Sequence, residues 1–473
     1  MSPKGISKVR RRTAFAFCLL APLLAAQFAW AGGVIARADL NPTSTNAHGG
    51  ASTNARSDAA AGLTATREGR LRVFDEVWSL VRERYYDPNL RGLDWRALGD
   101  GARAEAAAAP GEAEFYAVLR RLLASLRDPH TRVFPPGEGT DWRVRTFITV
   151  GLAVREVGGE IIVSEVERGS GAWRAGVRPG DALASLDGEP AATLVARRAE
   201  ERPFSSPQTA QTMAAARLFD GPRETTATAL FRRGGRLYGV ALRREVRVRE
   251  PAFESRELRG GVRLLSFNIF TAETAARLAR ELGGAAGRPP ALVIDLRDNG
   301  GGEAEAMTDA ASIFLPAGTP LGAFTDREGR VRLDPRARAA MLSSADELPR
   351  FGAPVVILAG PRTASAAEIF AAALAERGRA SIVGERSCGC VLGISRRHTL
   401  PDGGTLDISE TDFRTARGTR LEGAGVEPDH HVAPTREDLR TGRDAALARA
   451  VELVRAVGLA RPGRRGGGQA SAN

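Results

Sequence analysis

The chain has 473 residues, enough for two or three domains, with ordinary hydrophobic (43%) and charged (26%) fractions. Its formal net charge is +11, but no basic stripe interleaved with aromatic residues is present, so nucleic acid is not an expected partner. Much of the excess charge lies at the N-terminus, in Lys4, Lys8, Arg10, Arg11 and Arg12. No lysine follows Lys8, which excludes a lysine general base from the rest of the chain.

Residues 1–31 are typical of a secretory signal, with a basic start, an apolar run over 13–30 and the small-residue site Ala29-Trp30-Ala31. The alternative is an uncleaved membrane anchor, because the apolar run could span a bilayer if residues 32–36 extend it. Both alternatives predict an exported body, periplasmic or held at the outer face of the inner membrane. Residues 32–65 are rich in small and polar residues and predict a flexible linker.

Cys388 and Cys390 are the only cysteines after the predicted signal. In an oxidising compartment they could pair with each other, although a loop of this spacing is tight. Cys390 could in principle act as a nucleophile, but nothing in the sequence places a base beside it. The two thiols lack the spacing of a zinc site, so we expect no metal, and no other cofactor is indicated.

Apolar residues recur at helical spacing within 66–143 and predict a helical region that ends after Asp128-Pro129-His130. Residues 249–457 then alternate between predicted strands and helices, including a buried strand at 291–296 and a helix beginning near Ala304. This alternation is typical of an α/β core. The Gly-rich residues 458–473 predict a disordered tail.

Between these regions, residues 144–248 resemble a PDZ domain. The resemblance is carried by Val150-Gly151-Leu152-Ala153-Val154 and by Gly176-Val177-Arg178-Pro179-Gly180-Asp181. It implies that Val150, Gly151, Leu152 and Ala153 bind a substrate tail: the loop would bind a C-terminal carboxylate through backbone N–H groups, and the adjoining strand edge would add the peptide as a further strand. Another small β-domain with the same turn is the alternative.

Ser365 follows an apolar run that breaks at Gly360-Pro361 and precedes a predicted helix. A serine at a helix N-terminus lies where unpaired N–H groups and the helix dipole favour negative charge, so it is a candidate nucleophile. The same residues, Ser365-Ala366-Ala367-Glu368, also fit a capping box, in which the hydroxyl only satisfies a backbone N–H. The local sequence leaves both possibilities open.

Four motifs resemble those of the carboxyl-terminal processing (tail-specific) serine peptidases, in the order and spacing of that family. They are Asp295-Leu296-Arg297-Asp298-Asn299-Gly300-Gly301-Gly302, Thr363-Ala364-Ser365-Ala366-Ala367-Glu368, Gly384-Glu385 and Glu422-Gly423-Ala424-Gly425-Val426-Glu427-Pro428-Asp429. The resemblance covers about residues 66–457. It implies an α/β catalytic core with crotonase-like βαβ units, a PDZ-gated tunnel and cleavage of extended polypeptides by an activated serine.

Carried over by motif, the resemblance makes Ser365 the nucleophile and the backbone N–H groups of Ala366 and Gly301 the oxyanion donors. Most bacterial members pair the serine with a lysine 25 residues later, where this chain has Cys390. The tricorn-like branch of the superfamily instead uses a histidine and a glutamate. Their counterparts here are His130 and Glu422, so the resemblance suggests a Ser365–His130–Glu422 triad.

These inferences predict an exported serine endopeptidase whose PDZ domain captures polypeptide C-termini of unfolded or extended substrates. The competing prediction is a catalytically inactive relative that binds peptides or acts as a scaffold. A third possibility is an active enzyme with another base. The sequence does not predict the oligomeric state.

Overall fold

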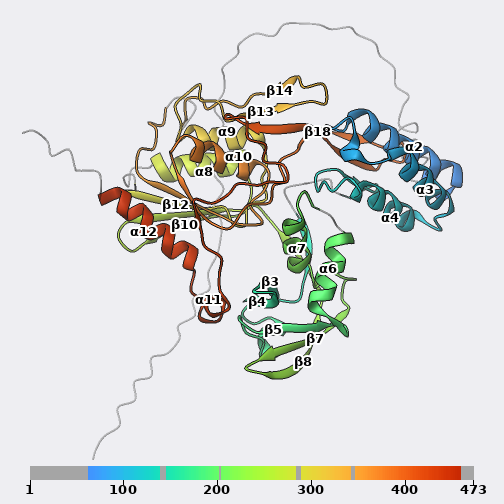
Figure 1. Ribbon diagram of the computed structural model, residues 1–473, viewed down its shortest axis with the longest axis horizontal. Helices are drawn as coiled ribbons and strands as arrows, with labels where there is room; N and C mark the ends of the chain where they lie inside the picture. The colour runs from blue at the N-terminus through green and yellow to red at the C-terminus, as the bar shows by residue number, and fades with distance from the viewer. Residues whose placement is uncertain (1–61, 139–144, 202–203, 284–288, 342–346, 460–473) are drawn as a thin grey trace, which may run out of the picture. The chain divides into compact units, whose positions relative to one another are not determined.

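The computed structural model describes residues 62–138, 145–201, 204–283, 289–341 and 347–459. The predicted signal, most of the predicted linker and almost all of the predicted tail lie outside these ranges. The described chain has a mixed α/β fold, which confirms the predicted fold class (Figure 1). Within these ranges, no helix combines the length and the apolar character needed to cross a membrane.

The N-terminal region consists of helices that lie together in Figure 1. They are η1 (Leu63–Ala65), α2 (Arg67–Arg84), η2 (Leu90–Gly92), α3 (Trp95–Ala108) and α4 (Glu112–Ala124). Thr66 begins α2 as its N-cap, because its Oγ1 accepts a hydrogen bond from the Gly69 N–H at 3.0 Å. The buried faces of α2, α3 and α4 form one apolar core with Leu406 and Ile408, which ties this region to a strand far along the chain.

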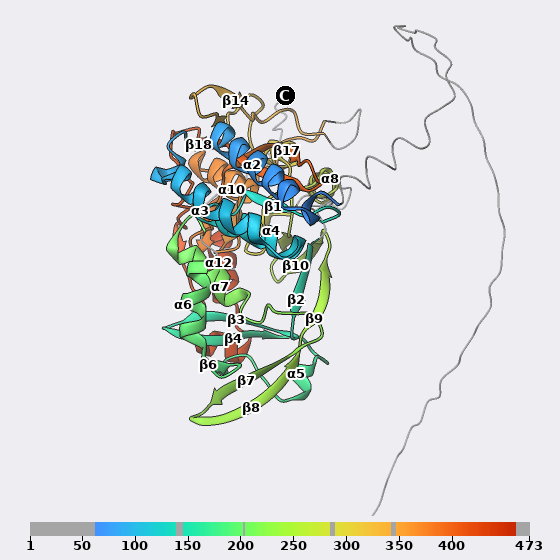
Figure 2. The ribbon, with the colours of Figure 1, turned by 90° about the vertical axis from the view of Figure 1, so that its right-hand side faces the viewer.

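An inserted β-domain follows, built on an antiparallel sheet with strand order β3-β4-β5-β7-β8. Its elements are β3 (Leu152–Val157), β4 (Glu160–Val166), α5 (Gly171–Arg174), β5 (Ala182–Leu186), β6 (Glu189–Pro190), α6 (Ala191–Glu201), α7 (Pro207–Ala216), β7 (Thr226–Arg233) and β8 (Arg236–Arg243). The chain enters and leaves the domain through an antiparallel pair, β2 (Arg145–Thr149) and β9 (Glu245–Arg249). Strand β3 lies at the sheet edge, paired with β4, and α7 packs against it (Figure 2).

The core contains a six-stranded sheet with strand order β10-β11-β12-β15-β16-β19, parallel from β11 onward. Its elements are β10 (Phe253–Leu258), β11 (Val262–Phe267), α8 (Ala272–Gly283), β12 (Ala291–Asp295), α9 (Ala304–Ser312), β15 (Val355–Ala359), α10 (Ala366–Glu376), β16 (Ser381–Gly384), β19 (His430–His431), α11 (Arg436–Thr441) and α12 (Ala445–Leu459). Parallel strands bring their carboxyl ends to one edge, where α/β proteins commonly hold their functional residues.

Helices cover both faces of this sheet (Figure 1). Leu292 and Ile294 of β12 pack into the core formed with α8, α9 and α10, whereas Val293 packs on the other face with Ala450 and Val454 of α12. This alternation follows from the period of two in a strand. It also explains why β12 is a continuous apolar run, since both of its faces are buried.

A second sheet, with strand order β1-β18-β13-β14 and β17 also paired to β18, connects the N-terminal helices to the core. Its strands are β1 (Arg132–Phe134), β13 (Gly322–Thr325), β14 (Val331–Leu333), β17 (Gly393–Thr399) and β18 (Thr405–Thr415). Strand β1 begins two residues after His130 and pairs with β18 in the register Arg132↔Asp407. This pairing fixes the Asp128-Pro129-His130 segment beside the core.

Ion pairs and a hydrogen bond join the inserted domain to the core. Arg155 of β3 donates to both carboxylate oxygens of Glu385 at 2.7 Å, just after β16. Arg436 of α11 donates to Glu160 of β4 at 3.1 Å. At the start of α7, Thr209 Oγ1 donates to the Cys388 carbonyl at 2.8 Å. The inserted domain therefore contacts residues 385–388 of the core.

Candidate active site

Ser365 lies at the junction of β15 and α10, in the strand, turn and helix predicted from the sequence. The turn is held by Thr363, which is fully buried. Its Oγ1 accepts from the Gly360 N–H at 3.0 Å and donates to the Leu296 carbonyl at 2.7 Å. Because Leu296 follows the neighbouring strand β12, this side chain joins the ends of β12 and β15 and fixes where Ser365 begins α10.

The backbone of Ser365 has a positive φ of 56°, with ψ of −123°. A residue other than glycine is held there only when its surroundings determine the conformation. The Ser365 N–H donates to the Cys390 carbonyl at 2.9 Å and to Glu368 Oε2 at 3.0 Å. Strain of this kind at a strand-to-helix turn is a feature of nucleophile elbows, where it exposes the serine hydroxyl.

Glu368 is fully buried, and its carboxylate accepts hydrogen bonds from a neighbouring loop as well as from the start of α10. Its two oxygens accept from the N–H groups of Ser365, Gly389 and Cys390 at 3.0, 2.7 and 2.9 Å, and from the Ser387 hydroxyl. Burial raises its pKa to about 7, and these donors oppose the rise. Glu368 thus fills the acceptor role of the predicted capping box while also binding the loop that contains both cysteines.

The glycine turn after β12 lies directly against Ser365. A Cβ on Gly301 would lie 2.6 Å from the Ser365 Cβ and 3.1 Å from the Ala366 nitrogen. The Gly301 N–H donates to Asn299 Oδ1 at 2.9 Å. As the first residue of α10, Ala366 has no acceptor for its N–H inside the helix. The predicted oxyanion donors are therefore adjacent, and the Gly301 amide is bound to Asn299.

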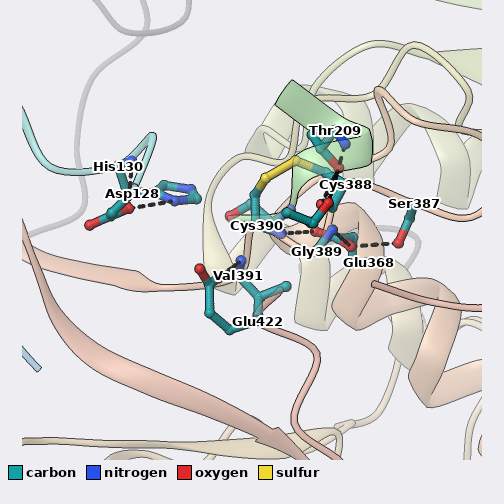
Figure 3. Close-up of a disulfide and its surroundings, with 12 residues drawn as sticks. Asp128, His130, Thr209, Glu368, Ser387, Cys388, Gly389, Cys390, Val391 and Glu422 are labelled. Atoms are coloured by element: carbon teal, nitrogen blue, oxygen red, sulfur yellow. Dashed lines mark hydrogen bonds and ion pairs between the residues drawn. A yellow bond between two sulfur atoms is a disulfide. The ribbon is translucent and has the colours of Figure 1, made fainter. Parts of the chain in front are cut away.

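His130 lies beside a buried carboxylate within its own motif (Figure 3). Its Nδ1 is 3.8 Å from Asp128 Oδ1, and the same oxygen accepts the His130 backbone N–H at 2.8 Å. The second oxygen, Oδ2, accepts from the Thr131 hydroxyl at 2.5 Å. Asp128 therefore fixes the turn that presents the imidazole. The motif itself was visible in the sequence, but this role of Asp128 was not.

Glu422 has a fully buried side chain. Its Oε2 accepts from the Val391 N–H at 3.0 Å, one residue after the cysteine loop (Figure 3). Burial raises its pKa to about 7, while the Ser205 hydroxyl, the Val391 N–H and, more weakly, the guanidinium of Arg91 oppose the rise. The carboxyl group is therefore poised to change protonation near neutral pH.

Arg91 is a residue that the sequence reasoning missed. The Nη2 atom of Arg91 lies 3.6 Å from Glu422 Oε1. Its Nη1 atom donates to the carbonyls of Leu126 and Arg127 at 3.0 and 2.6 Å. The latter carbonyls immediately precede the Asp128-Pro129-His130 turn, so Arg91 links the glutamate to the histidine segment. No sequence signal distinguished it in so arginine-rich a chain.

One cavity of about 2300 Å³ brings together four of the five predicted catalytic and oxyanion residues. Its lining includes Ser365, Ala366, Gly301 and His130, together with both cysteines. Glu422 is not among the lining residues. The cavity is large enough for an extended peptide rather than a small molecule alone.

The four predicted tail-binding residues lie outside the lining of this cavity. Val150 is buried in the core of the inserted domain. Gly151 has a φ of 77° and donates its N–H to Thr149 Oγ1 at 3.0 Å. Leu152 and Ala153 begin the edge strand β3. The structure therefore separates these residues from Ser365.

Cys388 and Cys390 form a disulfide, with their Cα atoms 5.2 Å apart (Figure 3). The position where most bacterial relatives would have a lysine is thus half of a disulfide, and in this state Cys390 has no thiolate to attack with. Among the described residues, no cluster of His, Cys, Asp and Glu has the geometry of a metal site.

Residues 259–432 match peptidase family S41, and residues 67–124 match the tricorn protease C1 domain. The chain therefore contains a peptidase S41 domain, preceded by a region similar to the tricorn protease C1 domain. It is thus grouped with serine-type endopeptidases. Among S41 relatives, the chloroplastic C-terminal processing peptidase of Tetradesmus obliquus is 29% identical over 373 residues, 76% of this chain and 77% of that protein. A putative tricorn protease homolog of Streptomyces coelicolor is 28% identical over 400 residues, 80% of this chain and 32% of that protein.

Solved structures share the S41 fold. The photosystem II D1 C-terminal processing protease is 24% identical with a TM-score of 0.50, covering 80% of this chain and 99% of that one. Mature CPAF complexed with lactacystin is 14% identical with a TM-score of 0.61, covering 83% of this chain and 98% of that one.

Substitution of Gly301 should damage the S41 site more than substitution of its neighbour. In Gly301→Ala the new methyl group would overlap the Ser365 Cβ, so we expect kcat to fall about 10²-fold or more, as when an oxyanion donor is displaced. Gly300→Ala is the matched control, because a Cβ there meets no atom within 4 Å. Steady-state kinetics on a peptide substrate would measure both, and equal activity of the two variants would contradict the assignment.

Removal of Arg91 should shift the pH dependence of activity. Its positive charge lowers the pKa of Glu422, so Arg91→Gln should raise that pKa and move the acid limb of kcat/KM to higher pH. The loss should therefore be larger at pH 7 than at pH 8.5. Arg91→Lys should retain most of the profile, and Arg96→Gln, at an exposed position of α3, should leave it unchanged. An unshifted profile in Arg91→Gln would contradict the role.

Proposed function

We propose that this chain is an exported, C-terminal processing serine endopeptidase that uses Ser365 as its nucleophile. The observation that carries the proposal is the strained backbone of Ser365 at the start of α10, in a cavity that His130 also lines. A capping serine has no need of a backbone with positive φ, whereas a nucleophile at a strained strand-to-helix turn does.

In this mechanism Ser365 Oγ attacks the substrate carbonyl while His130 takes its proton. The Ala366 N–H, at the positive end of α10, stabilises the oxyanion together with an N–H of the glycine turn. The Gly301 N–H would exchange its bond to Asn299 for the oxyanion. His130 then returns the proton to the leaving amine, and water hydrolyses the acyl-enzyme.

A carboxylate must orient the histidine, and two are available. Glu422 is the triad partner proposed from the motifs, and with its raised pKa it would be ionised, and able to orient the imidazole, mainly above neutral pH. Asp128 is the carboxylate that lies 3.8 Å from His130 Nδ1. We assign the orienting role to Glu422 and the fixing of the turn to Asp128.

The inserted domain is proposed to act as a PDZ domain that captures the C-terminal tail of a substrate. Its edge strand β3 has α7 packed beside it, which is the arrangement needed to add a peptide strand. The free carboxylate would be bound at the loop that contains Val150 and Gly151. Captured polypeptides would then extend into the cavity.

Export is proposed from the signal-like N-terminus, either cleaved or kept as an anchor. The Cys388–Cys390 disulfide supports it, because such bonds persist in oxidising compartments. Fractionation of cells that produce the full chain would measure whether the protein reaches the periplasm.

A catalytically inactive peptide-binding protein is the competing function. Two observations favour it: the Gly301 N–H is already bound to Asn299, and Glu422 does not line the cavity and accepts from the Val391 N–H. Resting forms of active enzymes can also show incomplete catalytic contacts, so these observations do not remove the peptidase proposal.

Cleavage of an unfolded protein with an apolar C-terminus tests both functions. We expect cleavage by the wild type, loss of at least about 10³-fold in Ser365→Ala and His130→Ala, and a smaller loss in Glu422→Gln. A substrate with an amidated C-terminus should show a raised KM, because the proposed carboxylate contact is lost. Tail-dependent binding without cleavage would favour the inactive alternative. Cleavage undiminished in Ser365→Ala would overturn the proposed nucleophile.

A further inference from the structure

The segment 387–391, here called the disulfide loop, is bound directly to the nucleophile. The Cys390 carbonyl accepts the Ser365 N–H at 2.9 Å. The N–H groups of Gly389 and Cys390 donate to Glu368, which also binds Ser365. The strained backbone of Ser365 is therefore held by two acceptors. One is the Cys390 carbonyl, which belongs to the loop, and the other is Glu368, which the loop binds.

The disulfide loop also contacts elements on its other sides. The Cys388 N–H donates to the Thr363 carbonyl at 2.9 Å, in the turn before the nucleophile. The Gly389 carbonyl accepts from the Gly423 N–H at 2.8 Å, next to Glu422. The Cys388 carbonyl accepts from Thr209 of the inserted domain.

Residues of the loop are in neither helix nor strand, so the regular backbone ladders do not fix them. What closes the loop covalently is the Cys388–Cys390 bond. Both cysteines are buried within the protein, at 5% and 2% exposure, yet both line the cavity that contains Ser365. A small dithiol entering the cavity can thus meet the bond without unfolding of the core.

We infer that the Cys388–Cys390 disulfide is a redox-sensitive positioning element, which holds Ser365 in its reactive conformation and whose reduction by a dithiol lowers peptidase activity. This inference rests on the proposed function. In the reduction, the S–S bond accepts two electrons and two protons and becomes two thiols. The dithiol loses the same electrons and protons and becomes a disulfide.

The expected effect follows from preorganisation. Without the covalent closure, residues 388–390 gain backbone freedom, and the acceptor for the Ser365 N–H and the donors to Glu368 are no longer fixed together. Substrate contacts elsewhere in the cavity do not depend on this bond. The chemical step should therefore suffer more than binding.

The test measures wild-type activity and free-thiol content of the full chain in dithiothreitol buffers of graded redox potential. We expect kcat to fall roughly tenfold or more on reduction, the loss expected when about one well-placed hydrogen bond is removed, with KM changed less than about twofold. Activity and thiol content should show the same midpoint potential, and reoxidation should restore both. The Cys388→Ser/Cys390→Ser double variant should have low activity that dithiothreitol does not change.

Hydrogen exchange of the same samples provides a readout that does not need activity. Reduction should speed exchange of the Ser365, Gly389 and Cys390 amides and leave those of β12 unchanged. If the wild type cleaves no substrate in either state, the proposed function has failed, and exchange alone decides the inference. Full activity with free thiols, or unchanged exchange at these amides, would overturn it.

Discussion

The candidate active site depends on one buried carboxylate. Glu368 accepts hydrogen bonds from the nucleophile's own backbone N–H, from two amides of the disulfide loop and from the Ser387 hydroxyl. An unpaired carboxylate in this position would be strongly destabilising, so these donors must remain in place around it. Because Glu368 lies one helical turn into α10, the start of that helix and the loop beside it form a single unit. The strained conformation of Ser365 persists inside that unit.

The absence of lysine after Lys8 changes the electrostatics of the site relative to a lysine-dependent peptidase. A disulfide occupies the expected lysine position and can neither accept a proton nor carry charge. Burial instead raises the pKa of two carboxyl groups, Glu368 and Glu422, to about 7. Since these folded-state values lie above those of an unfolded chain, both groups contribute stability below about pH 4.5 that is lost as pH rises through 7. Ionisation of Glu422 therefore lowers the free energy of unfolding.

The sequence predicted the parts of this protein that depend on local pattern. The apolar run before Gly360, the helical spacing after Ser365 and the continuous apolar run of β12 each follow from burial and turn chemistry, and each element is observed. Contacts between distant segments were not predictable. Arg91 meets Glu422, and Thr209 meets the disulfide loop, only because the fold brings their elements together. Motif resemblance selected His130 and Glu422 as candidates, but neither the role of Asp128 nor the absence of Glu422 from the cavity lining could be read from it.

The central claim is that Ser365 is a nucleophile activated by His130. The most direct measurement is mass spectrometry of the intact, oxidised protein after treatment with an irreversible serine-directed fluorophosphonate. We expect a single adduct on Ser365 in the wild type, and much slower adduct formation in His130→Ala, because the base that removes the hydroxyl proton is gone. No adduct on the wild type, or an adduct that forms at the same rate without His130, would contradict it.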